Sequence, residues 1–209
     1  MRITWLGHAS FLIESGGGKL VTDPFDGIGL EFPAVSADVV TTSHSHFDHN
    51  AAGKVGGGPV VISKAGESAQ GPFAITGIAT YHDESEGSER GENTVYVIEA
   101  EGLRVCHLGD LGHQLSGGQA TAIGRVDVLM VPVGGVYTVD AADAAQVADA
   151  LGPNVILPMH YKIEGLSLPI ADVSEFTARF EKVREADFLE IISGELPEET
   201  GVVVLKRQS

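Results

Sequence analysis

Three histidines and one aspartate fall within six consecutive residues of this chain, His44-Ser45-His46-Phe47-Asp48-His49. Residues two apart in an extended backbone point to the same side, so His44 and His46 can direct two imidazoles at one point. As the chain turns, Asp48 and His49 can be directed at a neighbouring point. Imidazole nitrogen and carboxylate oxygen are ligands that zinc, iron and manganese accept. The spacing therefore predicts a metal site rather than a polar loop that is rich in histidine by chance.

The elements around this hexapeptide follow from the apolar patterning. Residues 37–42, directly before it, are apolar and β-branched, which predicts a buried strand that surfaces into the loop. Further strands are predicted at residues 2–6, 11–14, 19–22, 59–63, 73–80, 93–100, 103–107, 126–133, 155–158 and 202–206. Apolar residues at helical spacing predict helices at 140–151 and 172–184. Strands and helices alternate without a Pro/Ser-rich linker, so we expect one domain, residues 1–209, of mixed α/β character.

The hexapeptide resembles the H-x-H-x-D-H signature of the metallo-β-lactamase superfamily. In that superfamily an αββα sandwich holds one or two metals at the edge of its sheets. Residues of the types that the superfamily uses follow in the expected order, each after a predicted strand: His82, Asp110 and His160. The opening Gly7-His8-Ala9-Ser10 also looks like that of small metal-dependent hydrolases with no added domain. The resemblance implies an α/β fold of the four-layer αββα type.

The resemblance also implies two adjacent divalent metal ions, in the first place zinc, with manganese or iron as alternatives. The implied ligands are three residues for each ion and one shared carboxylate: His44, His46 and His82 for the first, Asp48, His49 and His160 for the second, and Asp110 between them. Each ion would keep an open position for a shared water molecule. Such an open position distinguishes a catalytic site from a closed structural one.

The expected chemistry is hydrolysis. A water molecule between two dications loses its proton near neutral pH and becomes a nucleophile without a basic side chain. The ions can also stabilise the oxygens of the scissile carbonyl or phosphoryl group. Asp48 is the candidate catalytic residue, because it could orient the nucleophile or pass a proton to the leaving group. We expect cleavage of an ester, thioester, lactone, amide or phosphodiester bond.

Two other functions stay open. The same scaffold hosts oxygenases, so oxidative chemistry at a mononuclear iron is one alternative. Diiron relatives usually replace a histidine of the signature with a carboxylate, which this chain does not do at His44, His46 or His49. The other alternative is a metal-binding protein without catalysis. Metal identity, oxygen uptake and activity at full metal occupancy separate the three functions.

Three residues are candidates for contacts beyond these ligands. His8 follows the first predicted strand and could donate a hydrogen bond to a ligand or contact the substrate. His107 ends the predicted strand 103–107 and is expected in the core or behind the ligands, yet it is the substitute if His82 is not a ligand. Tyr161 follows the last implied ligand and could present its hydroxyl to the substrate.

The composition excludes several classes of protein. Thirteen basic and 29 acidic side chains give a formal net charge of −16 at pH 7, which opposes binding to a phosphate backbone. No apolar run approaches the ~20 residues that span a bilayer, and the first residues do not resemble a signal peptide. The single Cys106 excludes an intrachain disulfide. We expect a cytoplasmic protein with a small-molecule substrate and no nucleic-acid or membrane partner.

Overall fold

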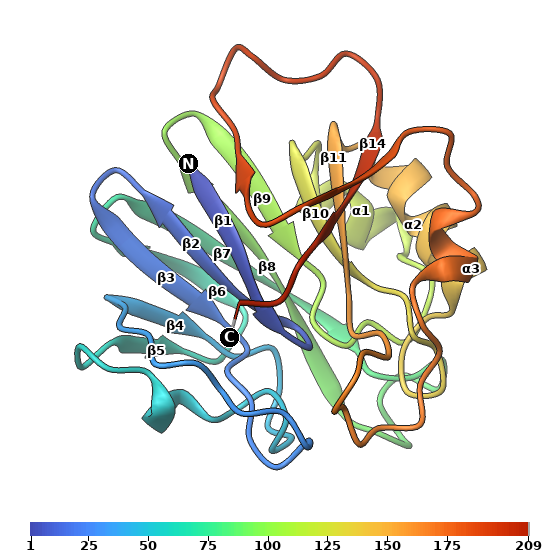
Figure 1. Ribbon diagram of the computed structural model, residues 1–209, viewed down its shortest axis with the longest axis horizontal. Coiled ribbons are helices and arrows are strands. Elements are labelled where there is room, and N and C mark those ends of the chain that lie inside the picture. The colour runs from blue at the N-terminus through green and yellow to red at the C-terminus, as the bar shows by residue number, and fades with distance from the viewer. Residues whose placement is uncertain (209) are drawn as a thin grey trace.

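The computed structural model describes residues 1–208 and places two sheets face to face (Figure 1). The strands of the first sheet are β1 Arg2–Gly7, β2 Ser10–Ser15, β3 Gly18–Thr22, β4 Val39–Thr41, β5 Val60–Ile62 and β13 Leu189–Glu190. The strands of the second sheet are β6 Gly66–Gln70, β7 Phe73–Tyr81, β8 Glu92–Ala100, β9 Leu103–His107, β10 Val128–Pro132, β11 Val155–Met159, β12 Val183–Ala186 and β14 Gly201–Leu205. The first sheet has the order β13-β1-β2-β3-β4-β5, and the second has the order β12-β14-β11-β10-β9-β8-β7-β6.

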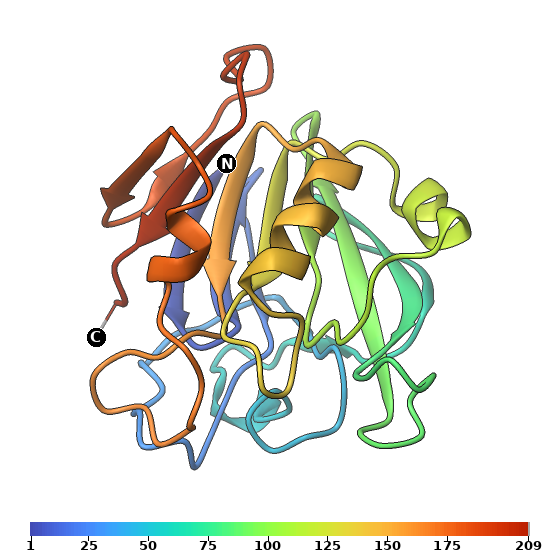
Figure 2. The same ribbon diagram turned by 90° about the vertical axis from the view of Figure 1, so that its right-hand side faces the viewer.

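Three helices lie over the outer face of the second sheet, α1 Gly117–Ile123, α2 Ala141–Leu151 and α3 Ser174–Thr177 (Figure 2). Helix α2 begins where the sequence predicts, because the Asp140 side chain accepts hydrogen bonds from two backbone N–H groups of the first turn. It ends at Gly152, which adopts the left-handed conformation. Within residues 1–208, no helix combines the length and the apolar character needed to cross a membrane.

The pleat of the first sheet divides its apolar side chains between two cores. Ile3, Trp5 and Leu20 belong to the core between the sheets. Their strand neighbours on the other face contact an irregular segment, residues 25–37, which covers the sheet with Phe25, Ile28, Leu30 and Phe32. The short 3-10 helix η1 Ala52–Lys54 follows further along the chain. The expected α/β fold with two stacked sheets is confirmed, and the covering layer on this side is irregular rather than α-helical.

The segment 172–184 departs from the predicted helix. Only Ser174–Thr177 is helical, and Val183–Ala186 pairs in parallel with β14 as strand β12. Phe176 is buried, with its ring centroid 4.9 Å from that of Phe180, so a short helix already satisfies the apolar spacing. Pairing with β14 gives the following backbone groups their hydrogen-bond partners, and this tertiary context outweighs local propensity.

Five strands that precede the predicted site residues, β1, β4, β7, β9 and β11, end at one edge of the sandwich together with β3. In the first sheet, β1, β3 and β4 run in the same direction. In the second sheet, β7, β9 and β11 share a direction. Their carboxyl ends meet at the lower side of the view in Figure 1. Residues just beyond these strands are therefore brought together from six separate parts of the chain.

Candidate metal centre

Six of the seven implied metal ligands converge at this edge in two adjacent groups, and the seventh, Asp110, lies between them. Potential ligand atoms of His44, His46 and His82 lie within 4.8 Å of one another. The second group has the same spread and contains Asp48, His49 and His160, together with His8. His8, which the sequence suggested only as a supporting contact, thus stands among the candidate ligands. Its Nε2 atom is 3.2 Å from Nε2 of His49 and 3.3 Å from Oδ2 of Asp48.

Asp110 lies between the two groups. Its Oδ2 atom is 3.2 Å from Nε2 of His82 and 3.9 Å from Nε2 of His44, both in the first group. The same oxygen is 3.2 Å from Nε2 of His49 and 3.3 Å from Nε2 of His160, both in the second group. One carboxylate oxygen therefore faces both sets of imidazoles.

Protonation states in the centre follow from burial and from neighbouring charges. Burial and the nearby His49 lower the pKa of His44 to about 3. Burial opposes ionisation of Asp110, but His160 and His49 hold the pKa of that carboxyl well below its ordinary value. Neutral imidazole and ionised carboxylate are the forms that bind cations. Near neutral pH these two residues are thus ready to bind a metal.

His49 behaves differently from His44. Burial alone would lower the pKa of His49, but the carboxylates of Asp110 and Asp23 raise it well above its ordinary value. The imidazolium then supplies positive charge between two buried carboxylates. A cation bound to Nε2 of His49 has to replace that proton, so metal binding at this group is expected to release protons.

Two buried polar atoms support the fit of a cation. Nε2 of His44 and Oδ1 of Asp110 have no hydrogen-bond partner within residues 1–208. Leaving a buried polar atom unpaired costs roughly 1–3 kcal/mol. A divalent ion within reach of both residues would satisfy these atoms, so the donor set fits such an ion.

A buried carboxylate behind the ligands, Asp23, was missed by the sequence analysis. Its Oδ2 atom accepts a hydrogen bond of 2.9 Å from Nδ1–H of His49. The Ser43 hydroxyl also donates to Asp23, and it therefore accepts the Nδ1–H of His44 at 2.9 Å. These hydrogen bonds fix the orientation of both rings, with Nε2 toward the centre. The available signal was an acidic residue in Thr22-Asp23-Pro24, directly after a strand, which is where the implied ligands also lie.

Asn93 of β8 fixes the segment that presents Asp110. Its Oδ1 atom accepts a hydrogen bond from the Asp110 N–H at 3.0 Å, and its Nδ2 donates to the Leu108 carbonyl at 2.9 Å. Gly109 between them has a φ of +56°, and a Cβ atom there would collide with Asn93 Oδ1 and the Ser43 side chain. Glycine is needed at this position for both reasons.

His107 lies behind the centre. Its Nε2–H donates to the Ala9 carbonyl at 2.8 Å, and its Nδ1 accepts a hydrogen bond of 3.2 Å from the Gly109 N–H. Both ring nitrogens are engaged, so His107 is not placed as a substitute for His82. It fits the expectation of a residue in the core or behind the ligands.

Tyr161 packs away from the centre. Its ring stacks on Trp5, with the centroids 5.1 Å apart, and burial raises the pKa of the hydroxyl. His160 has a φ of +52°, which redirects the chain immediately before Tyr161. Tyr161 is buried and does not line the metal cavity, so the suggested contact of its hydroxyl with a substrate has no support from this placement.

The centre opens into a cavity of about 350 Å³, a size suited to a small molecule. Its walls combine the candidate ligands with apolar and cationic side chains: His46, Phe47, Asp48, His82, Arg90, Asp110, Tyr137, His160 and Leu168.

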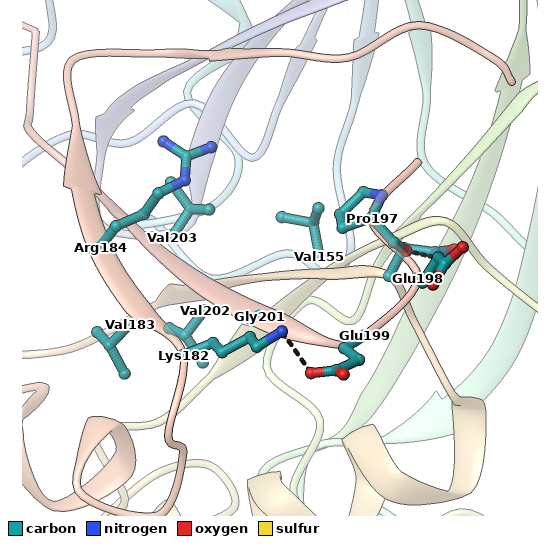
Figure 3. Close-up of a pocket in the computed structure, with 11 residues that line it drawn as sticks. Val155, Lys182, Val183, Arg184, Pro197, Glu198, Glu199, Gly201, Val202 and Val203 are labelled. Carbon is teal, nitrogen blue, oxygen red and sulfur yellow. Dashed lines mark hydrogen bonds and ion pairs between the residues drawn. The ribbon is translucent and has the colours of Figure 1, made fainter. Parts of the chain in front are cut away.

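A larger cavity, of about 560 Å³, lies between β12, β14 and the segment 197–199 (Figure 3). Lys182 and Glu199 form an ion pair there, and the residues that line it include no histidine. The candidate chemistry therefore belongs to the smaller cavity.

Comparison with known proteins gives a consistent set of relatives. A family model described as a β-lactamase superfamily domain matches residues 2–160. The crystal structure of a Thermotoga maritima protein, provisionally described as a Zn-dependent hydrolase of the metallo-β-lactamase superfamily, is 43% identical, covers 99% of each chain and has a TM-score of 0.85. A UPF0173 metal-dependent hydrolase of Archaeoglobus fulgidus is 29% identical over 77% of this chain and 83% of the relative. A UPF0173 protein of Pyrococcus furiosus is 30% identical over 88% of this chain and 92% of the relative. The matched residues 2–160 contain every residue of the centre.

Proposed function

Because this chain belongs to the metallo-β-lactamase superfamily of metal-dependent hydrolases, we propose that it binds two divalent metal ions and hydrolyses a small molecule. The bond is an ester, thioester, lactone, amide or phosphodiester, and zinc is the proposed metal. When bound, such ions acidify a shared water molecule and polarise the scissile oxygen. We place the protein in the cytoplasm.

The observation that supports two ions is the position of one oxygen. Oδ2 of Asp110 lies 3.2 to 3.9 Å from Nε2 atoms of both imidazole groups. In the proposed site the first ion would be held by His44, His46 and His82. The second would be held by Asp48, His49 and His160, and Asp110 would serve both. His8 is a further potential donor to the second ion.

Asp48 is the proposed catalytic side chain. Burial would raise the pKa of Asp48, but the hydrogen bond from His8 and the charge of His49 lower it well below its ordinary value. An ionised carboxylate accepts hydrogen bonds and has no proton to donate. Asp48 lines the cavity, so we assign it to orienting the attacking water molecule.

The test combines metal analysis with turnover. Purified protein should contain close to two divalent ions per chain, and a chelator should abolish hydrolysis that returning the metal restores. The probes are an ester, a thioester, a lactone, an amide and a phosphodiester. Asp110→Asn should lower the metal content and the activity together, because it removes the shared charge. Asp149→Asn, an exposed position on α2, is the matched control.

Three results would overturn the proposal. Hydrolysis that survives complete metal removal would exclude the mechanism. Iron as the purified metal, with oxygen uptake and no hydrolysis, would favour an oxidative enzyme instead. Full metal occupancy without turnover of any probe would favour a metal-binding protein without catalysis.

A further inference from the structure

Arg90 is the one lysine or arginine among the residues that line the metal cavity. Glu84, Glu86 and Glu89 share its loop, yet none of the ion pairs within residues 1–208 involves the Arg90 guanidinium. At the wall of the metal cavity the Arg90 guanidinium therefore carries a positive charge that no carboxylate of the described residues neutralises by a direct contact. Its donors are available to a ligand.

The loop that presents Arg90 is wound around one carboxylate. Oδ1 of Asp83 accepts hydrogen bonds from the N–H groups of Ser85 and Gly87, at 2.8 and 2.9 Å. Oδ2 of Asp83 accepts from the N–H groups of Glu89 and Arg90, at 3.1 and 2.7 Å. Asp83 directly follows the candidate ligand His82, so the loop is anchored to the centre itself.

A second contact orients the side chain. The Arg90 guanidinium carbon lies 5.8 Å from the centroid of the Tyr137 ring, within the range of a cation–π contact. Tyr137 is held by a three-residue turn, in which its N–H donates to the Gly135 carbonyl at 2.7 Å. Val136 at the centre of that turn has a φ of +64°, a strained conformation for a β-branched residue. Such strain is concentrated at functional sites.

The remaining wall of the cavity is apolar. Phe47 lines the cavity and is 62% exposed, so one large apolar side chain stands open to solvent at the centre. Leu168 also lines the cavity, and the Lys162 ammonium donates to the Leu168 carbonyl at 2.8 Å. Lys162 is thereby engaged in holding this wall. A cavity that combines apolar walls with a few polar groups is typical of a small-molecule site.

We infer that the substrate carries a carboxylate or phosphate group, which Arg90 binds, and an apolar portion that packs against Phe47 and Leu168. This inference rests on the proposed hydrolase function and names the substrate class of the same cavity. A guanidinium matches carboxylate and phosphate with two parallel hydrogen bonds. The scissile bond then faces Asp110 and Asp48, while the charged end is held at the mouth.

The test uses three para-nitrophenyl esters of equal acyl length, the hexanoate, the monoester of adipate and the ε-aminohexanoate. They end in a methyl group, a carboxylate and an ammonium. For the metal-loaded enzyme, kcat/KM should be highest for the adipate ester. The adipate-to-hexanoate ratio should fall by roughly 10- to 100-fold in Arg90→Ala, as expected for a hydrogen bond between charged groups. Arg90→Glu should shift the preference toward the ammonium ester.

Arg179→Ala removes an exposed arginine outside the cavity and should keep the wild-type ratio. Metal content and the unfolding midpoint of each variant show whether the fold and the centre are intact. Because the inference compares two substrates within one variant, a general loss of activity cancels from the ratio. A ratio that is unchanged in both Arg90 variants would overturn the inference.

A binding experiment tests the role of Arg90 even if the protein hydrolyses none of the esters. Calorimetry with hexanoate, hexyl phosphate and the neutral hexanamide measures the preference for charge directly. Tighter binding of hexanoate or of hexyl phosphate identifies the charged group, and Arg90→Ala should remove that preference. If wild-type protein hydrolyses none of the esters, the proposed function is contradicted for this bond type. Equal binding of hexanamide and both anions would contradict the role of Arg90 without contradicting the proposed hydrolase function.

Discussion

At the scale of single residues, the centre depends on a carboxylate that does not line the cavity. Burial raises the pKa of Asp23, but the nearby His107 and the hydrogen bond with His49 lower it below its ordinary value overall. Its Oδ1 atom also accepts the Ser43 N–H at 2.7 Å. Asp23 is therefore a buried anion whose partners are a candidate ligand and the residue before another. Such partners orient ligands and raise their basicity.

Asp23→Asn tests this positioning role. The substitution keeps the size of the side chain but removes its charge, so the Nδ1–H of His49 loses its charged acceptor. We expect metal affinity to fall by about 10- to 100-fold, the usual effect of losing such a partner. Competition with a chelator of known affinity measures this, and Asp149→Asn serves as the control. Unchanged affinity would show that Asp23 is only a structural anion.

The sequence indicated the candidate ligands and, with His8 and His107, two residues near them, but not the roles of Asp23 and Arg90. His44, His46, Asp48 and His49 form a recognisable pattern, and the structure places them with the distant residues that the resemblance implied. Asp23 and Arg90 belong to no pattern, because a lone acidic residue after a strand and a charged loop both look like ordinary surface. Only folding shows that the first is fully buried and that the second faces the cavity.

At the scale of elements, the loops that end the strands approach one another closely because glycine lies at the contact points. Gly109 touches Asn93 and Ser43, and a Cβ atom on Gly134 would collide with the His160 carbonyl. The backbones that present Asp110 and His160 could not reach their positions past larger residues. The approach of separate loops is thus a local steric property of two glycines.

Gly109→Ala should disturb the centre more than the fold core. The methyl group meets Asn93 Oδ1, and the φ of +56° is strained for alanine. We expect a loss of roughly 1–3 kcal/mol in the free energy of unfolding, with reduced metal content because Asp110 is displaced. Gly117→Ala, where nothing lies within 4 Å of the new methyl group, should leave both quantities near wild type. Urea unfolding and elemental analysis check the pair, and equal effects would contradict the steric argument.

The elements themselves were predictable where the local signal agreed with the tertiary context. The hairpin of β8 and β9 and the helix α2 appear where periodicity and caps indicated them. Helix α1 was missed, although Ser116 and Gln119 form a capping box that the spacing S-x-x-Q signals. The strand β12 could not be found locally, because its partner β14 supplies the reason for its conformation.

At the scale of the whole molecule, a centre rich in buried histidine links stability to pH. Burial and His160 lower the pKa of His8 from 6.5 to about 4, and burial lowers that of His44 to about 3. As pH falls from 6.5, these histidines take up protons in the unfolded chain but stay neutral in the folded protein. The free energy of unfolding of the metal-free protein therefore decreases. His49, whose pKa is raised, acts in the opposite sense and mainly above pH 6.5.

The variant His8→Gln tests how much one of these histidines contributes to the pH dependence of stability. Between about pH 7.5 and about pH 5, a histidine with the folded pKa of His8 lowers the free energy of unfolding by on the order of 2 kcal/mol. Urea unfolding of the chelator-treated protein at both pH values should therefore show a smaller loss in His8→Gln than in wild type. Each protein is compared with itself, so the steric cost of the substitution cancels from the difference. Equal losses in the two proteins would mean that folded His8 takes up a proton as readily as the unfolded chain does, in contradiction to a neutral ring held between Asp48, His49 and His160.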